Sequence, residues 1–417
     1  MAAQPRPEDP KGPSDHVLTS IEICAGAGGQ AIGLHQAGFK HLALVEIDPH
    51  AVQTLRENIR LLEGWSWERE YCDVISGDVN DFLPLPDKRN PLSGLNKPVK
   101  FLGGPLAKGR LDLLAGGVPC PPFSHAGKQL GKDDERDLFP RMLALVEELH
   151  PKAVMIENVR GIKDSKFEEY RTYIQARLKG GLARRPETGV EEHFPGLGYE
   201  VCEWDVLEAS DFGVPQLRPR AILVAIKKDV LGDIKFVWPT PVSAPRSVFD
   251  ALKASMEERY KPYLNADEGL ADTARRCLDR WKEYASSAAM TKKDGGIAPT
   301  LVGGSKKHGG ADLGPSRAKA AWKQLGVSGM GVANGYEEGK KKKSQGRDLF
   351  GEDGPMLTVE QAAIIQGFPP EWNFTGGKTA KYRQVGNAFP PPVAEAVGRA
   401  IADVLSAAHE RDDPTQA

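Results

Sequence analysis

Short apolar runs alternate with amphipathic stretches along the first half of the chain. Six runs have the length and apolar content of β-strands, at 18–23, 41–46, 72–76, 111–115, 153–156 and 221–226. Between them, apolar residues recur at helical spacing in 29–38, 49–62 and 137–150. Because strands that alternate with helices form βαβ crossovers, the pattern predicts an α/β fold with a doubly wound, mostly parallel sheet.

The second half of the chain follows a different pattern. The pattern of residues 250–290 predicts charged helix. Residues 291–347 hold 13 of the 45 glycines, a content that destabilises helices and strands. Helical patterns return at 358–366 and 391–408. The sequence therefore predicts a second, smaller and loop-rich domain after the sheet.

The amino-acid composition argues against several classes of protein. The chain is 40% hydrophobic and 27% charged, as globular proteins are, and it shows neither a bilayer-spanning apolar run nor a secretory signal. Five scattered cysteines, never spaced CxxC, argue against disulfides and structural zinc, and the nine histidines form no metal-binding motif. We therefore expect a cytoplasmic protein with no membrane partner and no metal.

The net charge of the whole chain is −2, but one segment is strongly basic. Residues 291–347 contain twelve Lys or Arg against four Asp or Glu. Such a segment in an otherwise acidic chain is typical of a phosphate-binding surface. A solvated basic loop would explain the charge equally well.

Glycines and carboxylates follow the first three predicted strands. Gly26, Gly28 and Gly29 lie between the first strand and a helix, where they allow a tight turn and a ligand at the helix N-terminus. Glu46 ends the second strand, and Asp78 follows the third. Since parallel strands end at one edge of a sheet, these residues predict a site for a nucleoside-bearing cofactor. The glycine turn alone would equally suit a dinucleotide, or no ligand at all.

Cys120 follows the fourth predicted strand and lies between Pro119 and Pro121. Prolines restrict the backbone and remove local N–H donors, which is an unusual setting for a core cysteine. A nucleophile needs a fixed, exposed thiolate, and this position at the ligand-binding edge offers one. The polar, glycine-containing residues 124–137 that follow have the character of a mobile lid.

Further candidates follow the last two predicted strands of the sheet. Glu157 comes directly after an apolar run and is a candidate acid, although it could also cap a helix or form an ion pair. Gln216, Arg218 and Arg220 alternate along an extended stretch, which predicts two guanidinium groups on one side. Such arginines suit phosphate or carbonyl recognition, and a surface ion pair is the alternative.

In this order, these residues resemble the C5-cytosine DNA methyltransferase family. The similarity runs from about 18 to 238 and resumes from about 355 to 402. Its most specific part is the Pro119-Cys120 loop, followed by Glu157-Asn158-Val159 and the cluster at 216–220. Residues 357–369 and Gln384-Val-Gly386-Asn387-Ala388 resemble the last two motifs of the family. The implied fold is the Rossmann-like fold of S-adenosylmethionine-dependent methyltransferases.

The resemblance implies a covalent reaction on DNA. Cys120 would add to C6 of a cytosine flipped out of the duplex, and S-adenosylmethionine would supply the methyl group. The catalytic residues implied are Cys120, Glu157, Arg218 and Arg220. The cofactor-binding residues implied are Cys24, Ala25, Gly26, Gly28, Gly29, Glu46, Ile47, Asp78, Val79, Pro119, Asn387 and Ala388. The substrate-binding residues implied are Ser124, Gln216, Thr300, Lys306 and Lys307.

The same resemblance implies a division of the chain and its partners. A disordered lead-in (1–14) would precede a catalytic and cofactor domain (15–238), a target-recognition domain (239–354), a hinge (355–378) and a C-terminal return (379–410). We expect a monomer that binds double-stranded DNA, with a cognate restriction endonuclease as a partner in the same system.

The chain departs from the family's pattern at three places. Cys24 stands where an aromatic residue usually packs on the cofactor adenine, Pro121 where glutamine is usual, and Pro355-Met356 where a basic residue is typical. Three other readings stay open: an RNA cytosine methyltransferase, a nicotinamide-dependent oxidoreductase, and a catalytically silent DNA-binding protein. The oxidoreductase would give no role to Cys120, and the long basic segment favours DNA over RNA.

Overall fold

A seven-stranded sheet forms the centre of the larger part of the molecule. The computed structural model describes residues 17–86, 98–101, 104–119, 137–241, 245–303 and 311–413. The strand order is β10-β11-β7-β6-β1-β2-β3. These strands are β1 (Thr19–Ile23), β2 (Lys40–Glu46), β3 (Asp73–Ser76), β6 (Leu113–Gly117), β7 (Ala153–Val159), β10 (Tyr199–Glu208) and β11 (Pro219–Lys227). Four of the six pairings are parallel, and those of β11 with β7 and β10 are antiparallel, which confirms the predicted mostly parallel sheet.

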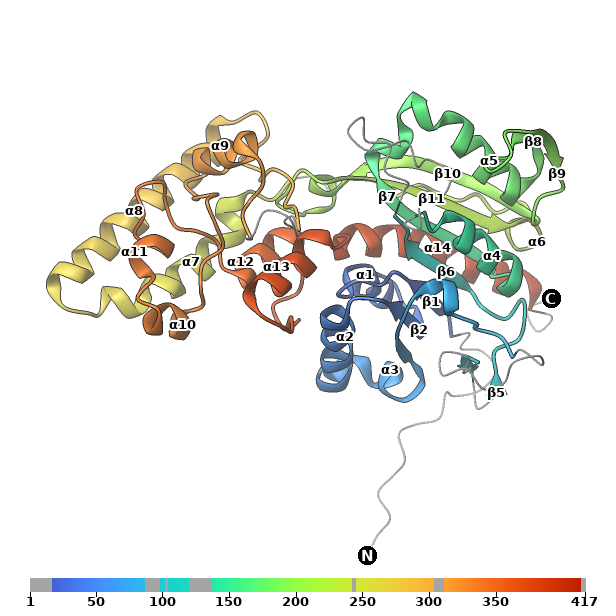
Figure 1. Cartoon of the computed structure of the whole chain (residues 1–417), viewed down its shortest axis with the longest axis horizontal. Helices are drawn as coiled ribbons and strands as arrows, with labels where there is room; N and C mark the ends of the chain where they lie inside the picture. The colour runs from blue at the N-terminus through green and yellow to red at the C-terminus, as the bar shows by residue number, and fades with distance from the viewer. Residues whose placement is uncertain are drawn as a thin grey trace, which may run out of the picture.

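Helices cover both faces of this sheet (Figure 1). On one face, α4 and α5 pack apolar side chains such as Leu145 and Ile174 against the strands. On the other, α1 and α14 contribute Leu34 and Val397 to a second buried cluster. The helices of this part are α1 (Gly29–Gln36), α2 (Pro49–Leu61), α3 (Ser66–Tyr71), α4 (Phe139–Leu149), α5 (Glu168–Lys179), α6 (Lys228–Leu231) and α14 (Pro391–Asp412). Two layers of helix around a parallel sheet are the doubly wound arrangement that the sequence predicts.

The first and last of these helices approach each other closely. A β-carbon on Gly33 of α1 would lie 2.4 Å from the carbonyl oxygen of Pro391 and 2.5 Å from Cβ of Ala394 in α14. On α14, a β-carbon at Gly398 would lie 2.8 Å from Cβ of Ala37. Glycine at positions 33 and 398 therefore allows the two helix backbones to pack directly on each other.

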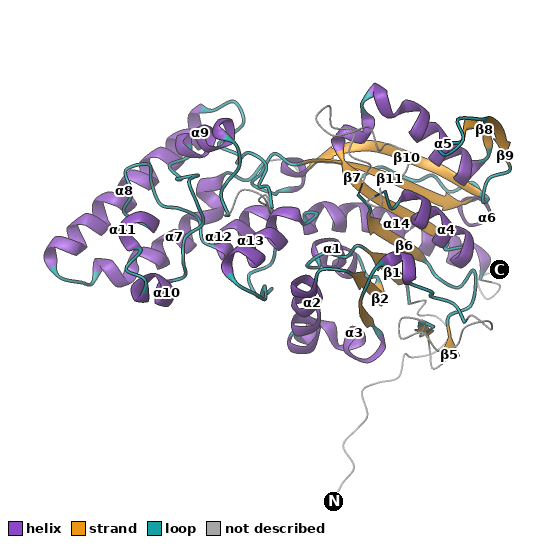
Figure 2. Cartoon of the chain, viewed as in Figure 1, coloured by secondary structure: helices purple, strands orange, loops and turns teal. Residues whose placement is uncertain are grey.

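A second, helical part extends to one side of the sheet (Figure 2). Its long helices are α7 and α8, which enclose the buried rings of Trp281, Trp322 and Tyr260. Its helices are α7 (Val248–Leu264), α8 (Glu268–Thr291), α9 (Ser316–Gln324), α10 (Tyr336–Lys341), α11 (Gln345–Asp348), α12 (Val359–Gln366) and α13 (Lys378–Asn387). The described residues between 291 and 347 form short helices joined by loops, as their glycine content predicts.

Some predicted strands differ from those observed. The strand predicted at 111–115 begins at Leu113, and the one predicted at 153–156 runs on to Val159, so Glu157 lies within β7 rather than after it. The edge strand β10 is not predicted by the sequence pattern, because its exposed and buried positions are mixed and several of its residues are charged. Two small hairpins are likewise not predicted; they are formed by β4 (Lys100–Phe101) with β5 (Gly104–Pro105) and by β8 (Gly181–Arg184) with β9 (Glu191–Phe194).

Within the described residues, no helix combines the length and the apolar character needed to cross a membrane.

Candidate active site

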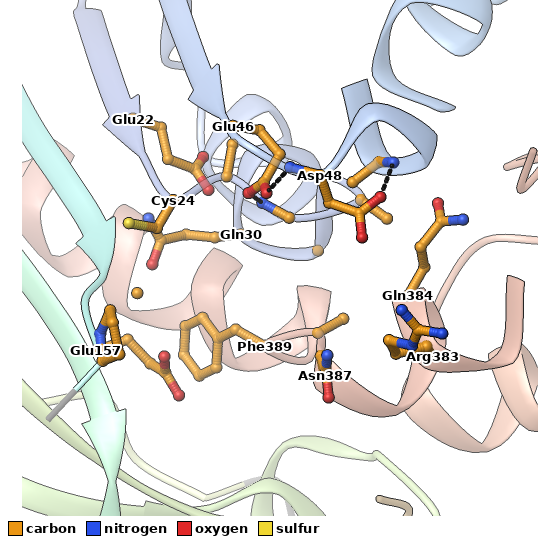
Figure 3. A pocket seen from close by; sticks show the side chains of 18 residues that line it. Glu22, Cys24, Gln30, Glu46, Asp48, Glu157, Arg383, Gln384, Asn387 and Phe389 are labelled. Carbon is orange, nitrogen blue, oxygen red and sulfur yellow. Dashed lines mark hydrogen bonds between the residues drawn. The ribbon is translucent and has the colours of Figure 1, made fainter. Parts of the chain in front are cut away.

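A cavity of about 360 Å³ opens at the carboxyl edge of the parallel strands. Its walls come from the β1–α1 loop, the end of β2, the ends of β6 and β7, and the segment between α13 and α14 (Figure 3). The lining residues include Cys24, Ala25, Gly26, Gly29, Glu46, Pro119, Glu157, Asn387 and Ala388, all of which the sequence analysis singled out. Residues more than 350 positions apart along the chain thus meet at one sheet edge.

The glycine turn is held by the side chain of Glu46. Oε2 of Glu46 accepts a hydrogen bond from the backbone N–H of Gly26 at 2.7 Å, and Oε1 accepts from the N–H groups of Ile47 and Asp48 at 2.9 and 2.7 Å. The backbone of Cys24, Gly26 and Gly28 has φ values of 53°, 55° and 92°, which fold the chain sharply at the end of β1. The carboxylate therefore ties the end of β2 to the turn between β1 and α1.

Two glycines of the turn face residues from the C-terminal part of the chain. A β-carbon on Gly28 would lie 2.7 Å from Cζ2 of Trp372, whose indole N–H donates to the carbonyl oxygen of Ala27 at 2.9 Å. A β-carbon on Gly29 would lie 2.2 Å from the carbonyl oxygen of Phe389. Close packing of distant segments therefore requires glycine at these two positions, whether or not a ligand binds against the turn.

Four predicted cofactor residues lie beside the cavity without lining it. The side chain of Ile47 is 66% exposed, and Asp78 caps the short 3₁₀ turn after β3 by accepting from the N–H of Asn80 at 2.9 Å. Val79 is buried in that turn, and Gly28 is covered by Trp372. Asp78 follows β3, the neighbour of β2, so it lies at the same sheet edge as Glu46.

Glu157 and Arg220 form an ion pair at the opposite end of the cavity. Nε of Arg220 lies 2.7 Å from Oε1 of Glu157, and both side chains are largely buried. Burial raises the pKa of the Glu157 carboxyl above its ordinary value, while Arg220 and Arg218 oppose the rise. Next to it, the side-chain amide of Asn158 donates to the carbonyl oxygen of Val118 at 2.7 Å. Asn158, the neighbour of Glu157 in β7, therefore also holds in place Val118, the residue before Pro119.

Arg218 is not among the residues that line the cavity, although it lies close enough to Glu157 and Arg220 to affect the pKa of Glu157. Strand β11 begins at Pro219, one residue later, and the Arg218 side chain is buried with 2% exposure. Its guanidinium donates to the carbonyl oxygens of Leu301 at 2.6 Å and Gly386 at 2.8 Å. Burial lowers the pKa of Arg218 to about 9. The residue therefore joins the sheet to the helical part and to α13.

Gln216 and Thr300 also make contacts within the chain. The amide nitrogen of Gln216 donates to Oε1 of Gln366 at 2.7 Å, and its oxygen accepts from the N–H of Leu301 at 2.7 Å. The Thr300 hydroxyl donates to the carbonyl oxygen of Leu217 at 2.5 Å. Gln216 is fully buried, so these bonds give it a structural role in this structure. The remaining predicted site residues, Cys120, Ser124, Lys306 and Lys307, lie outside the described residues.

Replacing Arg218 by methionine should lower the free energy of unfolding by about 2–4 kcal/mol, because two buried carbonyl groups lose their donors. Urea denaturation followed by circular dichroism measures this change. The matched variant Arg317→Met, on the exposed face of α9, should change stability by less than about 0.5 kcal/mol. Unchanged stability with lost activity in Arg218→Met would instead assign the residue to catalysis.

Several residues that line the cavity are not predicted by the sequence. Glu22 lies within β1, and Gln30 lies in the first turn of α1; Arg383 and Phe389 come from α13 and the loop that follows it, on either side of the motif that begins at Gln384. An acidic residue inside an otherwise apolar strand was the available signal for Glu22. The position of Gln30 after the glycine turn gave no comparable signal, since glutamine is common in helices.

Cys24 is the described cysteine that lines the cavity. Burial raises the pKa of its thiol to about 12, and the carboxylates of Glu46 and Glu22 add to the rise. At neutral pH this side chain is therefore a neutral thiol and a poor nucleophile. Among the described residues, no group of three or more His, Cys, Asp or Glu side chains is placed to hold a metal ion.

Known proteins resemble this chain over nearly its whole length. The model of the C-5 cytosine-specific DNA methylase family matches residues 18–403. The Type II methyltransferase M.NaeI of Lentzea aerocolonigenes is 44% identical over 398 residues, which cover 95% of this chain and 77% of that protein. The Type II methyltransferase M.NgoMIV of Neisseria gonorrhoeae is 42% identical over 392 residues, which cover 93% of this chain and 98% of that protein.

The fold is also found in a solved structure. A prophage-encoded protein of E. coli, described as a DNA modification methyltransferase, matches with a TM-score of 0.52 and 22% identity, covering 93% of this chain and 99% of that one. This likeness shows the fold alone. The family model and the two relatives show the family to which the chain belongs. The chain belongs to the C-5 cytosine-specific DNA methylases and is a DNA cytosine-5 methyltransferase, as its ordered motifs predict.

Proposed function

We propose that this enzyme methylates a cytosine flipped out of duplex DNA, through a covalent adduct of Cys120 and with S-adenosylmethionine as methyl donor. The observation that carries the proposal is one cavity that joins Pro119, the residue before Cys120, to Glu157 and to the glycine turn held by Glu46. A nucleophile's loop, an acid and a nucleoside-binding turn at one sheet edge suit methyl transfer to a base.

The residues of the cavity fit S-adenosylmethionine, which supplies an electrophilic methyl group when bound. Oε2 of Glu46 accepts a single hydrogen bond within the described chain, so it can accept another from a ribose hydroxyl. A β-carbon at Gly26 would meet nothing within 4 Å, which leaves room for a ligand against the turn. Asn387 and Ala388 would close the cofactor from the opposite side.

Glu157 and Arg220 would hold the target base. The raised pKa of Glu157 favours a carboxyl that can share a proton with N3 of cytosine while it accepts from the N4 amino group. Arg220 engages Oε1 of Glu157, which leaves Oε2 for the base, and its guanidinium would also approach the base oxygen. Addition of the Cys120 thiolate to C6 would make C5 nucleophilic enough to take the methyl group of S-adenosylmethionine, which would leave as S-adenosylhomocysteine. Loss of the C5 proton followed by elimination of Cys120 would then release 5-methylcytosine.

The DNA substrate would lie across both parts of the molecule. C5 and C6 are not accessible within a stacked duplex, so the base must turn out into the cavity. We assign residues 15–238 and 379–410 to the catalytic domain, 355–378 to the hinge, and 239–354 to recognition of a specific sequence, with Thr300, Lys306 and Lys307 toward DNA. The Type II names of the two relatives favour a restriction endonuclease as a system partner.

Labelled S-adenosylmethionine tests this function directly. Purified protein should transfer labelled methyl to duplex DNA, and bisulfite sequencing of DNA from expressing cells should place 5-methylcytosine in one sequence context. Transfer to RNA but not to DNA would contradict the substrate. Equal transfer to all cytosines would contradict sequence-specific recognition.

A further inference from the structure

A groove beside α14 lies outside the proposed active site, and it shares no lining residue with the cavity described above. Its volume is about 320 Å³. One side is formed by residues 234–240, which follow α6, and the other by α14. The helix contributes the small side chains of Ala396 and Ala400, and the facing segment contributes Trp238 and Pro239. The proposed reaction gives this groove no role.

The groove presents apolar side chains to its opening. Val237 is 70% exposed, and the half-buried ring of Trp238 packs against Phe236 with 6.0 Å between ring centres. Within the described residues, the indole N–H of Trp238 has no hydrogen-bond acceptor. A groove lined by an aromatic ring is the kind of surface on which proline-rich segments dock as a polyproline II helix.

Two opposite charges lie at the same groove. Lys235 and Asp403 are both exposed, and neither forms an ion pair within the part of the chain that the structure describes. Arg399, which also lines the groove, is paired with Glu395 at 2.7 Å. A proline-rich ligand that carries both an acidic and a basic side chain would therefore find a partner for each.

Residues 1–16 lie outside the described residues, and their sequence contains such a segment. Residues 7–13 read Pro-Glu-Asp-Pro-Lys-Gly-Pro, with proline at every third position. Because a polyproline II helix has three residues per turn, these prolines share one edge of it. A segment of this composition buries too little apolar surface to fold alone, but it can order on binding.

The segment joins the sheet on the side that carries the groove. Leu18, just before β1, packs against the same buried cluster as Trp238 and Ala396. Pro13 lies five residues earlier, and an extended chain covers about 17 Å in that length. The groove follows α14 from Ala396 to Val404, about 12 Å of helix, so it accommodates two prolines about 9 Å apart.

We propose that residues 7–13 bind in this groove of their own chain as a polyproline II helix, with Glu8 and Asp9 toward Lys235. Lys11 then lies toward Asp403. Attachment through only a few residues gives the segment an effective concentration on the order of millimolar at the groove, which favours it over a separate partner. Bound there, it covers Val237 and holds the connection between the sheet and α7 against α14.

Carbodiimide coupling of the full wild-type chain tests this docking, because the reagent joins only carboxylates and amines that are in contact. Mass spectrometry should locate a bond from Lys235 to Glu8 or Asp9. It should also locate a bond from Asp403 to Lys11.

Two variants should lower the yield of these bonds about tenfold or more, because each removes one side of the contact. The first combines Pro7→Gly, Pro10→Gly and Pro13→Gly, and the second is Trp238→Ala. The proline changes lie outside the sheet and its helices, so they remove the docking edge without a change in the packed core.

The matched control is Pro5→Gly, which leaves the three-residue spacing intact and should couple as wild type does. Coupling of Lys282 to Glu257, an ion pair at 2.7 Å in the helical part, measures the efficiency of the reaction in every variant. Equal yields in wild type and both variants, or no bond from residues 7–13 to the groove, would overturn the proposal. Bonds between isotope-labelled and unlabelled chains in a mixture would also overturn it, because they would assign the groove to a second copy.

Discussion

Replacing Cys120 by alanine should reduce methyl transfer to duplex DNA by about 10⁴-fold or more, because the proposed reaction has no other nucleophile to activate the base. Cytosine C5 is too weak a nucleophile to accept a methyl group until C6 carries an added group. The measurement is transfer of labelled methyl in a single turnover, with titration of S-adenosylhomocysteine to verify that the cofactor site is intact.

The expected loss of methyl transfer is specific to Cys120, because the four described cysteines are poorly suited to act as the nucleophile. Burial raises the pKa of Cys24 to about 12 and of Cys202 to about 11, and it raises that of Cys72 as well. Cys277 is buried within the helical part. A matched variant, Cys202→Ala on β10, should therefore transfer methyl at the wild-type rate.

A covalent adduct can also be observed directly. DNA with fluorine in place of the C5 hydrogen of the target cytosine cannot lose a proton after methylation, so Cys120 would stay bonded to C6. Wild-type protein should then migrate with the DNA in a denaturing gel, and Cys120→Ala should not. Equal transfer by wild type and Cys120→Ala would refute the covalent mechanism.

Replacing Glu157 by glutamine should lower the rate of methyl transfer by about 10²- to 10⁴-fold, the usual contribution of a positioned acid. Glutamine keeps the size of the side chain but cannot give a proton to N3 of the base, and it weakens the contact with Arg220. The single-turnover rate at saturating DNA and cofactor measures the effect on chemistry.

Two comparisons separate this effect from a loss of structure. Glu191→Gln, on the exposed strand β9, should leave the rate unchanged. The Glu157→Gln protein should still bind S-adenosylhomocysteine, because the cofactor contacts lie across the cavity at Glu46. A rate within about twofold of wild type would show that Glu157 is only the ion-pair partner of Arg220.

The sheet and its ligand-binding edge could be predicted because local patterns determine them. Apolar runs at 18–23 and 41–46 are bounded by glycine and acidic residues, and both form the expected parallel strands. Glu46 could be identified because it ends such a strand. The edge strand β10 was missed because a half-exposed strand with charged residues lacks that contrast between apolar and polar positions.

Other site features depend on contacts between distant segments, which no local pattern records. Arg218 resembles a catalytic arginine in sequence, yet it bonds to carbonyl groups of Leu301 and Gly386, 83 and 168 positions away. The glycine at position 28 suits a ligand turn, but its immediate neighbour is Trp372. The unpaired amide of Gln30 became evident only once burial and hydrogen bonds were known.

The contact between α1 and α14 has a consequence for how the enzyme is made. Helix α1 follows the first strand, but the helix that packs on Gly33 is the last element of the described chain. While the nascent chain emerges from the ribosome, the sheet face lined by Leu113 and Met155 can be covered by α1 but lacks α14 until residues 391–412 have been synthesised. The catalytic domain therefore completes its fold only after translation of the helical part, and its apolar face must be shielded until then.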